Sequence, residues 1–233
     1  MRRGHVAPVG GGEPLPPFSE SLVFWAPLTE GDLTDHISGS VGTTPSNNTN
    51  CSVTWDDNRG LYRINNRVSG FAGLWWQGLN MFPDAVNGST LMRDIPKTIY
   101  LKVLVVTTPN GNGYAYSVGV GAGNDGYNYN VTTGTQRAVA ECLCPTKAPF
   151  NIPIGTLHAI CYTRDNLTNT QYLDGTLVST NPNDPWTQLY YTRFGTRMSA
   201  VFCPQNAGDI ADMCIQDIRI YNRALTASEV AQL

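Results

Sequence analysis

Short runs of β-branched and aromatic residues alternate with clusters of turn-forming residues from Leu22 onward. This spacing is typical of an antiparallel sandwich or barrel. The expected strands are Leu22–Leu28, Ser52–Trp55, Leu61–Asn65, Phe71–Trp76, Thr98–Thr107, Ala115–Val120, Tyr127–Val131, Thr156–Thr163, Thr170–Leu173, Thr176–Ser179, Tyr190–Phe194 and Ile215–Tyr221. The pattern therefore predicts an all-β chain.

Three local signals refine this prediction. Asp174-Gly175 stands between two apolar pairs, which is the strongest short-range sign of a two-residue hairpin turn. Apolar residues occupy both faces of the strand expected over residues 156–163, so we expect it in the middle of a sheet. Thr226 and Glu229 form a Thr-x-x-Glu capping box, which predicts a short helix at the end of the sequence.

The composition supports one β-sandwich domain. The chain has 233 residues, of which 14% are charged, with 23 glycines and 15 prolines, and this argues against a long helical bundle. The net charge is −3 and the basic residues are scattered, so nucleic acid is not an expected partner. No apolar stretch approaches the roughly 20 residues of a membrane span. We expect an arm at residues 1–20 and the sandwich at residues 21–233.

The arm is rich in Gly and Pro and has no apolar core of its own. It is interpreted either as a frayed end lying on its own domain or as an arm that packs against a neighbouring subunit. The second interpretation predicts partner contacts at Arg2, Arg3, His5, Pro8, Pro14, Pro17 and Phe18. No export signal is visible, which favours a protein that acts where it is made or leaves inside an assembly; a trimmed leader is the alternative.

Six cysteines would permit three disulfides in an oxidising compartment. Cys142-x-Cys144 lacks the spacing and the second pair of a zinc site. Cys161 and Cys214 lie in apolar strand patterns, where a reduced cysteine serves as a small buried hydrophobe. We expect reduced cysteines, whereas disulfides would indicate a secreted protein.

Three segments resemble the laminin G-like jelly rolls of the concanavalin A-like lectin and glucanase superfamily. They are residues 22–28 with Asp35-His36-Ile37-Ser38-Gly39, residues 155–162 with Tyr172-Leu173-Asp174-Gly175, and residues 215–226. The resemblance covers about residues 22–233 and implies two antiparallel sheets packed face to face, one of them curved. Ile215, Ile218 and Ile220 break a strict two-residue alternation, which predicts a β-bulge. These residues identify a fold and leave the ligand open.

The sequence argues against an enzyme. A retaining glycosidase of this superfamily would place two carboxylates about 5 to 5.5 Å apart, whereas the glutamates of this chain are dispersed: Glu13, Glu20, Glu30, Glu141 and Glu229. A dispersed acid pair stays open as a distant alternative. His158, within a strand, is expected to be a core or sheet-face residue. The residue types at positions 121–126 match the Gly-x-Gly-x-x-Gly pattern of dinucleotide-binding loops. In such loops a helix follows the glycines, whereas here a strand is expected after them.

Calcium is a frequent cofactor of the family, and a structural calcium ion is left open. Asp32 and Asp35 in the first loop and Asp217 on the last strand would supply oxygen ligands if the fold brings them together.

Carbohydrate binding in this superfamily uses aromatic faces and amide side chains, because a ring packs against the apolar face of a sugar and sugar hydroxyls need polar partners. The candidates are Trp75, Trp76, Tyr127, Asn128, Tyr129, Trp186, Tyr190 and Tyr191. Trp186 is the best single exposed candidate. Trp75 and Trp76 are neighbours on a strand, so we expect one of them in the core, and we assign Trp25 and Trp55 to packing.

Two functions remain. The first is a non-catalytic interaction protein of an assembly, a bacteriophage virion surface component such as a head decoration or fibre protein. It would be assembled in the host cytoplasm, anchored by the arm, and form a homo-oligomer or part of a larger complex. The second is a secreted or cell-surface lectin-like module that binds polysaccharide.

Overall fold

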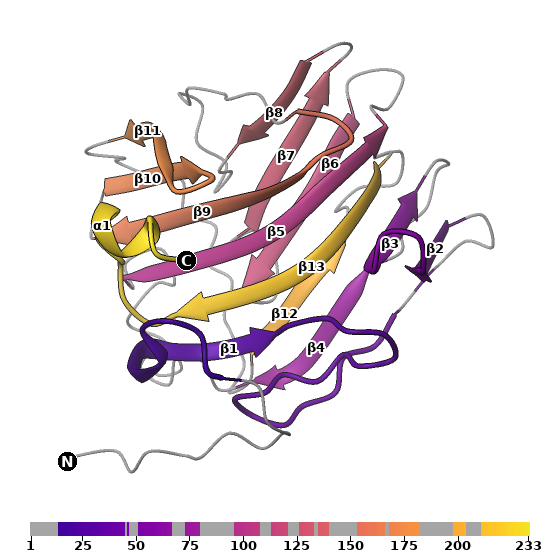
Figure 1. Cartoon of the computed structure of the whole chain (residues 1–233), viewed down its shortest axis with the longest axis horizontal. Coiled ribbons are helices and arrows are strands. Elements are labelled where there is room, and N and C mark those ends of the chain that lie inside the picture. Colours follow the sequence, from indigo (N-terminus) through magenta and orange to yellow (C-terminus); the bar gives the residue numbers. More distant parts are fainter. Residues whose placement is uncertain are drawn as a thin grey trace.

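Figure 1 shows a computed structural model of the protein, which describes residues 14–44, 46, 51–66, 73–79, 96–107, 113–120, 126–132, 135–139, 153–165, 168–181, 198–203 and 211–233. The larger, eight-stranded sheet has the order β11-β10-β9-β5-β13-β3-β2, and β1 also pairs with β13. Its strands are β1 (Leu22–Ala26), β2 (Cys51–Asp56), β3 (Leu61–Asn66), β5 (Lys97–Thr107), β9 (Leu157–Asp165), β10 (Thr168–Leu173), β11 (Thr176–Asn181) and β13 (Ala211–Tyr221). The five-stranded sheet has the order β4-β12-β6-β7-β8 and contains β4 (Leu74–Leu79), β6 (Gly113–Val120), β7 (Gly126–Thr132), β8 (Thr135–Val139) and β12 (Met198–Cys203).

The two antiparallel sheets pack face to face around an apolar core (Figure 1). Alternate residues of the central strands point into it, among them Leu101 of β5 and Ile218 and Ile220 of β13, which are almost fully buried. From the smaller sheet, the ring of Trp76 contacts that of Phe24 edge to face, with centroids 5.2 Å apart. The expected β-sandwich is therefore confirmed.

The outer face of the larger sheet carries a second apolar cluster. Strand neighbours alternate between faces, so Tyr100 belongs to this cluster while Ile99 and Leu101 belong to the core. The short helices η1 (Ser19–Ser21) and α1 (Ala227–Val230) flank the cluster. Its buried members are Leu22, Trp25, Tyr100, Cys161, Tyr172, Tyr221, Leu225 and Val230.

The local sequence signals are confirmed. Asp174 and Gly175 join β10 to β11 with φ values of 50° and 74°, which is the backbone of a type I′ hairpin turn. The register of β13 against β5 shifts between Ile215 and Asp217, as a bulge requires. β9 lies between β10 and β5, and both hydrogen bonds of the capping box that starts α1 are present.

Two strands were not expected from the sequence, β8 and β12. Neither has the alternation of β-branched and aromatic residues that marks its neighbours, and each is held by its ladder to β7 or to β4 and β6. The strand expected at 71–76 runs instead over Leu74–Leu79. The strand expected at 190–194 lies outside the described residues. In the part of the chain that the structure describes, no helix has the length and apolar character needed to cross a bilayer.

Candidate functional site

The adjacent tryptophans of β4 belong to opposite faces of the smaller sheet. Trp76 is fully buried, and its Nε1 donates a hydrogen bond to the carbonyl of Leu33 at 2.7 Å. The expectation that Trp76 contacts a sugar is wrong, because its ring has no exposed surface on which a sugar could stack. Strand alternation places Trp75 on the outward face of β4, where it remains a candidate.

Cross-strand register divides the three candidates on β7 between the two faces. Tyr127 lies in one lateral row with Leu74 of β4, through β6 and β12. Laterally paired residues share a face of a sheet, and Leu74 is fully buried in the core. By backbone register, Tyr127 and Tyr129 share the parity of Leu74, and Asn128 shares that of Trp75. The part of all three residues in binding stays a prediction.

Backbone register gives Trp75 and Asn128 the same parity across four strands of the smaller sheet. We call these two residues and the register positions of the same parity between them the outward strip. The backbone positions of Trp75 and Asn128 are separated by three strand spacings and by two positions along the strand, or about 16 Å. An aromatic residue at one end and an amide at the other suit a short oligosaccharide, which could stack on the first and hydrogen-bond to the second. The residues between them are Val201 and Cys203 of β12 and Ser117 and Gly119 of β6.

Trp186, Tyr190 and Tyr191 lie outside the described residues, and their part in binding stays a prediction.

Asp35 of the first loop is fully buried and bound to backbone groups. Its Oδ1 accepts hydrogen bonds from the amides of Trp25 at 2.9 Å and Ile37 at 3.1 Å, and its Oδ2 accepts one from the amide of Ser38 at 3.2 Å. Burial raises the pKa of Asp35, while these bonds act in the opposite direction. Asp35 thereby holds the first loop against β1.

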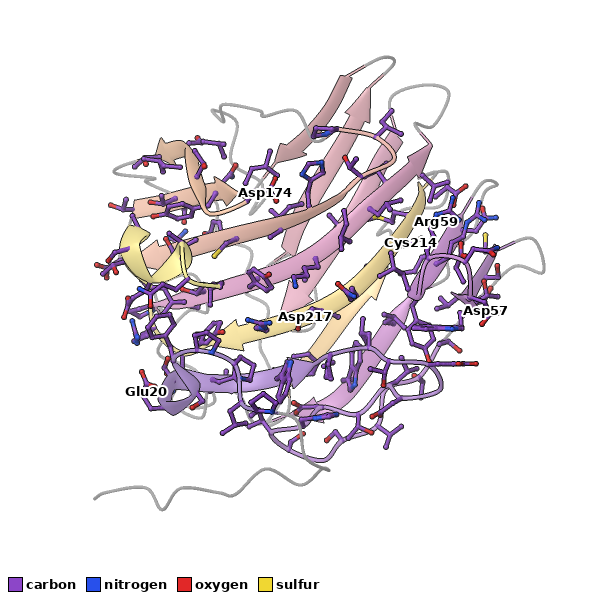
Figure 2. The ribbon with its side chains drawn as sticks, in the orientation of Figure 1. Glu20, Asp57, Arg59, Asp174, Cys214 and Asp217 are labelled. Atoms are coloured by element: carbon purple, nitrogen blue, oxygen red, sulfur yellow. The ribbon has the colours of Figure 1, made fainter. Side chains whose placement is uncertain are left out.

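The other two expected calcium ligands also have protein partners. Hydrogen bonds from Thr34 lower the pKa of Asp32. Asp217 lies on the outer face of β13 (Figure 2), where its Oδ2 is 2.5 Å from Nη2 of Arg219. Among the residues described, no three His, Cys, Asp or Glu side chains gather as a metal site. A structural calcium ion therefore stays a prediction, without a ligand set in this part of the chain.

No sequence signal marked Arg219 as an organising residue. Its Cζ lies 4.7 Å from the ring centroid of Tyr100, which is its lateral neighbour on β5. Burial raises the pKa of Tyr221, two positions further along β13, to about 12, although Arg219 acts in the opposite direction. The last strand thus carries a cation held between an acid and aromatic rings.

His158 is a sheet-face residue of β9, as expected, with a side chain that is 14% exposed. Its Nδ1 is 2.7 Å from Oδ2 of Asp174, and its Nε2 is 2.7 Å from Oγ1 of Thr156. The other carboxylate oxygen of Asp174 accepts a hydrogen bond from the amide of Ala159 at 2.8 Å. Asp174 thus continues the pairing of the hairpin with β9 beyond the end of β10 (Figure 2).

Cys161 and Cys214 are buried and free, and the expectation that the cysteines are reduced stays a prediction. Burial raises the pKa of both thiols, that of Cys214 to about 11. Cys142 and Cys144 lie outside the described residues.

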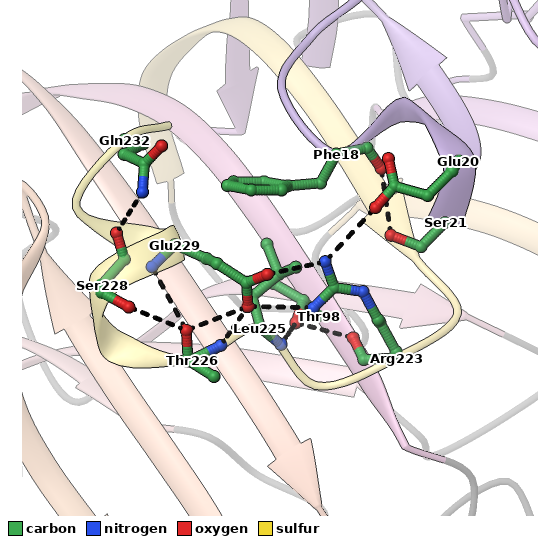
Figure 3. A network of polar contacts seen from close by, with 10 residues as sticks. All are labelled: Phe18, Glu20, Ser21, Thr98, Arg223, Leu225, Thr226, Ser228, Glu229 and Gln232. Atoms are coloured by element: carbon green, nitrogen blue, oxygen red, sulfur yellow. Dashed lines mark hydrogen bonds and ion pairs between the residues drawn. The ribbon is translucent and has the colours of Figure 1, made fainter.

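Figure 3 shows the polar contacts between the segment before β1 and the segment after β13. Arg223 contacts Glu229 through two hydrogen bonds of 2.8 and 2.9 Å, and its Nη2 is 3.5 Å from Oε1 of Glu20. Its Cζ lies 5.6 Å from the ring centroid of Phe18. We call Phe18, Glu20, Arg223 and Glu229 the clasp.

The clasp contains Phe18, one of the residues expected to contact a partner through the arm. Phe18 packs against the second apolar cluster of its own domain, while Pro14 and Pro17 are exposed. Arg2, Arg3, His5 and Pro8 lie outside the described residues. Contacts of the arm with other subunits therefore stay a prediction.

Comparisons with known proteins agree with this architecture. A family model described as the concanavalin A-like lectin/glucanases superfamily matches residues 96–231. A sequence search of curated proteins found no match.

Two kinds of protein are found among the solved structures similar to this chain. Trypanosoma rangeli sialidase in complex with sialic acid has a TM-score of 0.61 and 17% identity, over 98% of this chain and 34% of the sialidase. The binding domain of botulinum neurotoxin serotype D has a TM-score of 0.61 and 11% identity, over 91% of this chain and 51% of that one. The receptor binding domain of the C/D mosaic serotype has a TM-score of 0.62 and 12% identity, over 92% and 51%. The chain thus spans between a third and a half of these proteins, and the likeness is one of fold.

Proposed function

Because this chain belongs to the concanavalin A-like lectin/glucanases superfamily, we propose that it is a non-catalytic carbohydrate-binding protein. One fold hosts many functions, so the assignment must rest on a site. The observation that carries it is the outward strip, in which backbone register gives Trp75 and Asn128 the same parity across four strands of the smaller sheet. The sialidase was solved with sialic acid, which makes acidic sugars the first ligands to test.

The described carboxylates support the absence of catalysis. A glycosidase needs one accessible acid with a raised pKa beside a second carboxylate. Burial raises the pKa of Asp35, but its carboxylate is fully buried and bound to backbone amides. Asp56, Asp212, Asp217 and Glu229 are each paired with an arginine. Arg223 and the amide of Thr226 lower the pKa of Glu229 to about 2, so this residue is poorly suited to donate a proton.

A glycan panel followed by calorimetric titration of the strongest ligand tests the proposal. Trp75→Ala should weaken binding by about tenfold or more, as truncation of an aromatic anchor commonly does. Asn128→Ala should weaken it by a smaller factor through the lost hydrogen bonds. Tyr127→Phe is the matched control, because Tyr127 lies on the other face of the sheet, and its affinity should equal that of the wild type.

Two outcomes would count against the outward strip. If none of the bacterial and host polysaccharides binds, the proposal of carbohydrate binding itself is wrong. Binding that Trp186→Ala abolishes and Trp75→Ala leaves intact would move the site from the sheet to the loop that carries Trp186.

We further propose that the protein lies on the surface of a bacteriophage virion, as a head decoration or fibre component anchored by the arm. The Gly- and Pro-rich composition of the arm motivates it. The unbridged thiols of Cys161 and Cys214 also fit folding in a reducing compartment. A secreted or cell-surface module is the alternative.

Deletion of residues 1–13 tests the arm while leaving the clasp intact. If the arm anchors the protein, the deletion should abolish its incorporation into purified particles, while the isolated domain still folds and binds the same glycan. Undiminished incorporation would overturn the anchoring role.

A further inference from the structure

Three side chains with the chemistry of a nucleophile, a base and an acid meet at the beginning of β9. They are Thr156, which directly precedes the strand, His158 of the strand itself, and Asp174 of the hairpin turn after β10 (Figure 2). Nε2 of His158 lies 2.7 Å from Oγ1 of Thr156, and its Nδ1 lies 2.7 Å from Oδ2 of Asp174. We call these three residues the relay. A hydroxyl beside a base that a third group orients is the arrangement that activates a nucleophile.

Backbone hydrogen bonds hold both ends of the relay. Oδ1 of Asp174 accepts a hydrogen bond from the amide of Ala159 at 2.8 Å, and the amide of Asp174 donates one to the carbonyl of Ala159, also at 2.8 Å. The amide of Gly155, the residue before Thr156, donates to the carbonyl of Val105 in β5 at 2.9 Å. The relay is therefore built on strands of the larger sheet.

The carboxylate of Asp174 sets the direction of the hydrogen bonds in the relay. An ionised carboxylate only accepts hydrogen bonds, so Nδ1 of His158 carries the proton. In the neutral imidazole, Nε2 is then an acceptor, and the hydroxyl of Thr156 donates to it. The Thr156 proton thus already points at the base that would remove it.

The relay is open to solvent. Thr156 is exposed, and the side chain of Asp174 is 51% exposed. Only the imidazole between them is largely buried, with 14% of its surface exposed. A buried hydroxyl needs a protein partner, whereas an exposed one can bond to water. A reagent in solution can therefore reach Oγ1 of Thr156.

We infer that Thr156 is a nucleophile that takes an acyl group from an activated acyl ester or thioester. Its Oγ1 attacks the carbonyl carbon while Nε2 of His158 takes the hydroxyl proton. The bond to the leaving oxygen or sulfur then breaks, and the leaving group takes that proton from His158. The products are an ester on Thr156 and a free alcohol or thiol.

The reaction is a single self-modification of each chain, which is compatible with a non-catalytic protein. Because Thr156 is exposed, water solvates the oxyanion, and the large acceleration of a closed oxyanion hole is not expected. General-base assistance alone should accelerate the reaction about 100-fold. The inference does not depend on carbohydrate binding, because the relay is built on the larger sheet and the outward strip lies on the smaller one.

Acetylation of the folded full chain with p-nitrophenyl acetate, followed by peptide mass spectrometry, tests the inference. Thr156 should be acetylated about 100-fold faster than Thr176, which is also exposed but lies outside the relay. The difference should disappear in urea, where the relay is unfolded. Thr156→Val, which removes only the hydroxyl, should lose the label.

Asp174→Asn tests Asp174 as the positioning residue. The amide of Ala159 holds the side-chain oxygen of the new residue, so its NH₂ group faces Nδ1 of His158. Nε2 then carries the proton and no longer accepts one from Thr156. Acetylation of Thr156 should fall to the rate of Thr176. The matched control Asp165→Asn makes the same exchange at the exposed last residue of β9 and should react like the wild type.

Equal rates at Thr156 and Thr176 in the folded protein would overturn the inference, and so would an undiminished rate in Asp174→Asn. A fast rate at Thr156 that persists in urea would overturn it as well, because the local sequence would then suffice. Should Asp174→Asn not fold, the comparison of the folded wild type with the wild type in urea decides. Trp75→Ala should keep the wild-type rate of acetylation, so that this inference and carbohydrate binding fail separately.

Discussion

A Cβ atom added to Gly42 would lie 2.5 Å from Cε2 and 2.7 Å from Nε1 of Trp76. The ring cannot retreat, because it is fully buried and its Nε1 is bonded to Leu33. Gly42 and Leu33 thus hold the first loop against the edge of the smaller sheet. This contact joins β1 of the larger sheet to β4 of the smaller one.

Gly42→Ala should therefore lower the free energy of unfolding by about 1–3 kcal/mol, the usual cost of overpacking a core. Urea denaturation followed by tryptophan fluorescence measures it. Val41→Ala, at a neighbouring position that is 70% exposed, is the control and should change the free energy by less than about 0.5 kcal/mol. An unchanged Gly42→Ala protein would mean that the loop can move away from the indole.

The position of Asp174 supports a second prediction. Its carboxylate binds the amide of Ala159, and its φ of 50° suits Asp or Asn. Asp174→Ala should lower the free energy of unfolding by about 2 kcal/mol, from an unsatisfied amide together with backbone strain. Asp174→Asn should cost less, because its amide oxygen still accepts the Ala159 hydrogen bond. Equal losses in the two variants would show that the ion pair with His158 dominates instead.

The sequence predicted the larger sheet better than the smaller one, and the reason is physical. β5, β9 and β13 contain apolar residues at neighbouring positions because they contribute to clusters on both of their faces. Their pattern is therefore strong. β8 and β12 depend on lateral pairing with strands far away in the sequence, which no local pattern records.

The candidate site was predicted in part. The sequence indicated that one of Trp75 and Trp76 is buried, but which one depends on the ladder of β4 with β12. Likewise, Tyr127 and Asn128 were equal candidates until register placed them on opposite faces. The clasp could not be foreseen, because Glu20 and Arg223 are 203 residues apart in the chain.

The buried thiols give a third prediction. Because burial raises the pKa of Cys161 and of Cys214, neither forms an appreciable thiolate near neutral pH. Brief treatment of the folded protein with iodoacetamide, followed by peptide mass spectrometry, should leave both residues unmodified, whereas the same treatment in urea should modify both. Rapid modification of Cys161 in the folded protein would contradict its burial.

Glu229 gives a prediction about acid stability. Its pKa is lowered from the usual 4.5 to about 2, first by the hydrogen bond from Arg223 and then by that from the Thr226 amide. A carboxyl group whose pKa is lower in the folded state stabilises the protein above its unfolded pKa. That stability is lost as the pH falls from about 4.5 toward the folded pKa of about 2.

Glu229→Gln keeps the size of the side chain and removes its charge. The variant should be less stable than the wild type at neutral pH, by about 1 kcal/mol or less because the pair with Arg223 is partly exposed to solvent. The difference should shrink below pH 4.5 and vanish once the pH falls below the folded pKa of about 2, where the wild-type carboxyl is itself protonated. Urea denaturation across this range measures the difference, and Glu30→Gln, at an exposed glutamate outside the clasp, is the matched control. A difference that stays constant with pH would show that the side chain acts through packing alone.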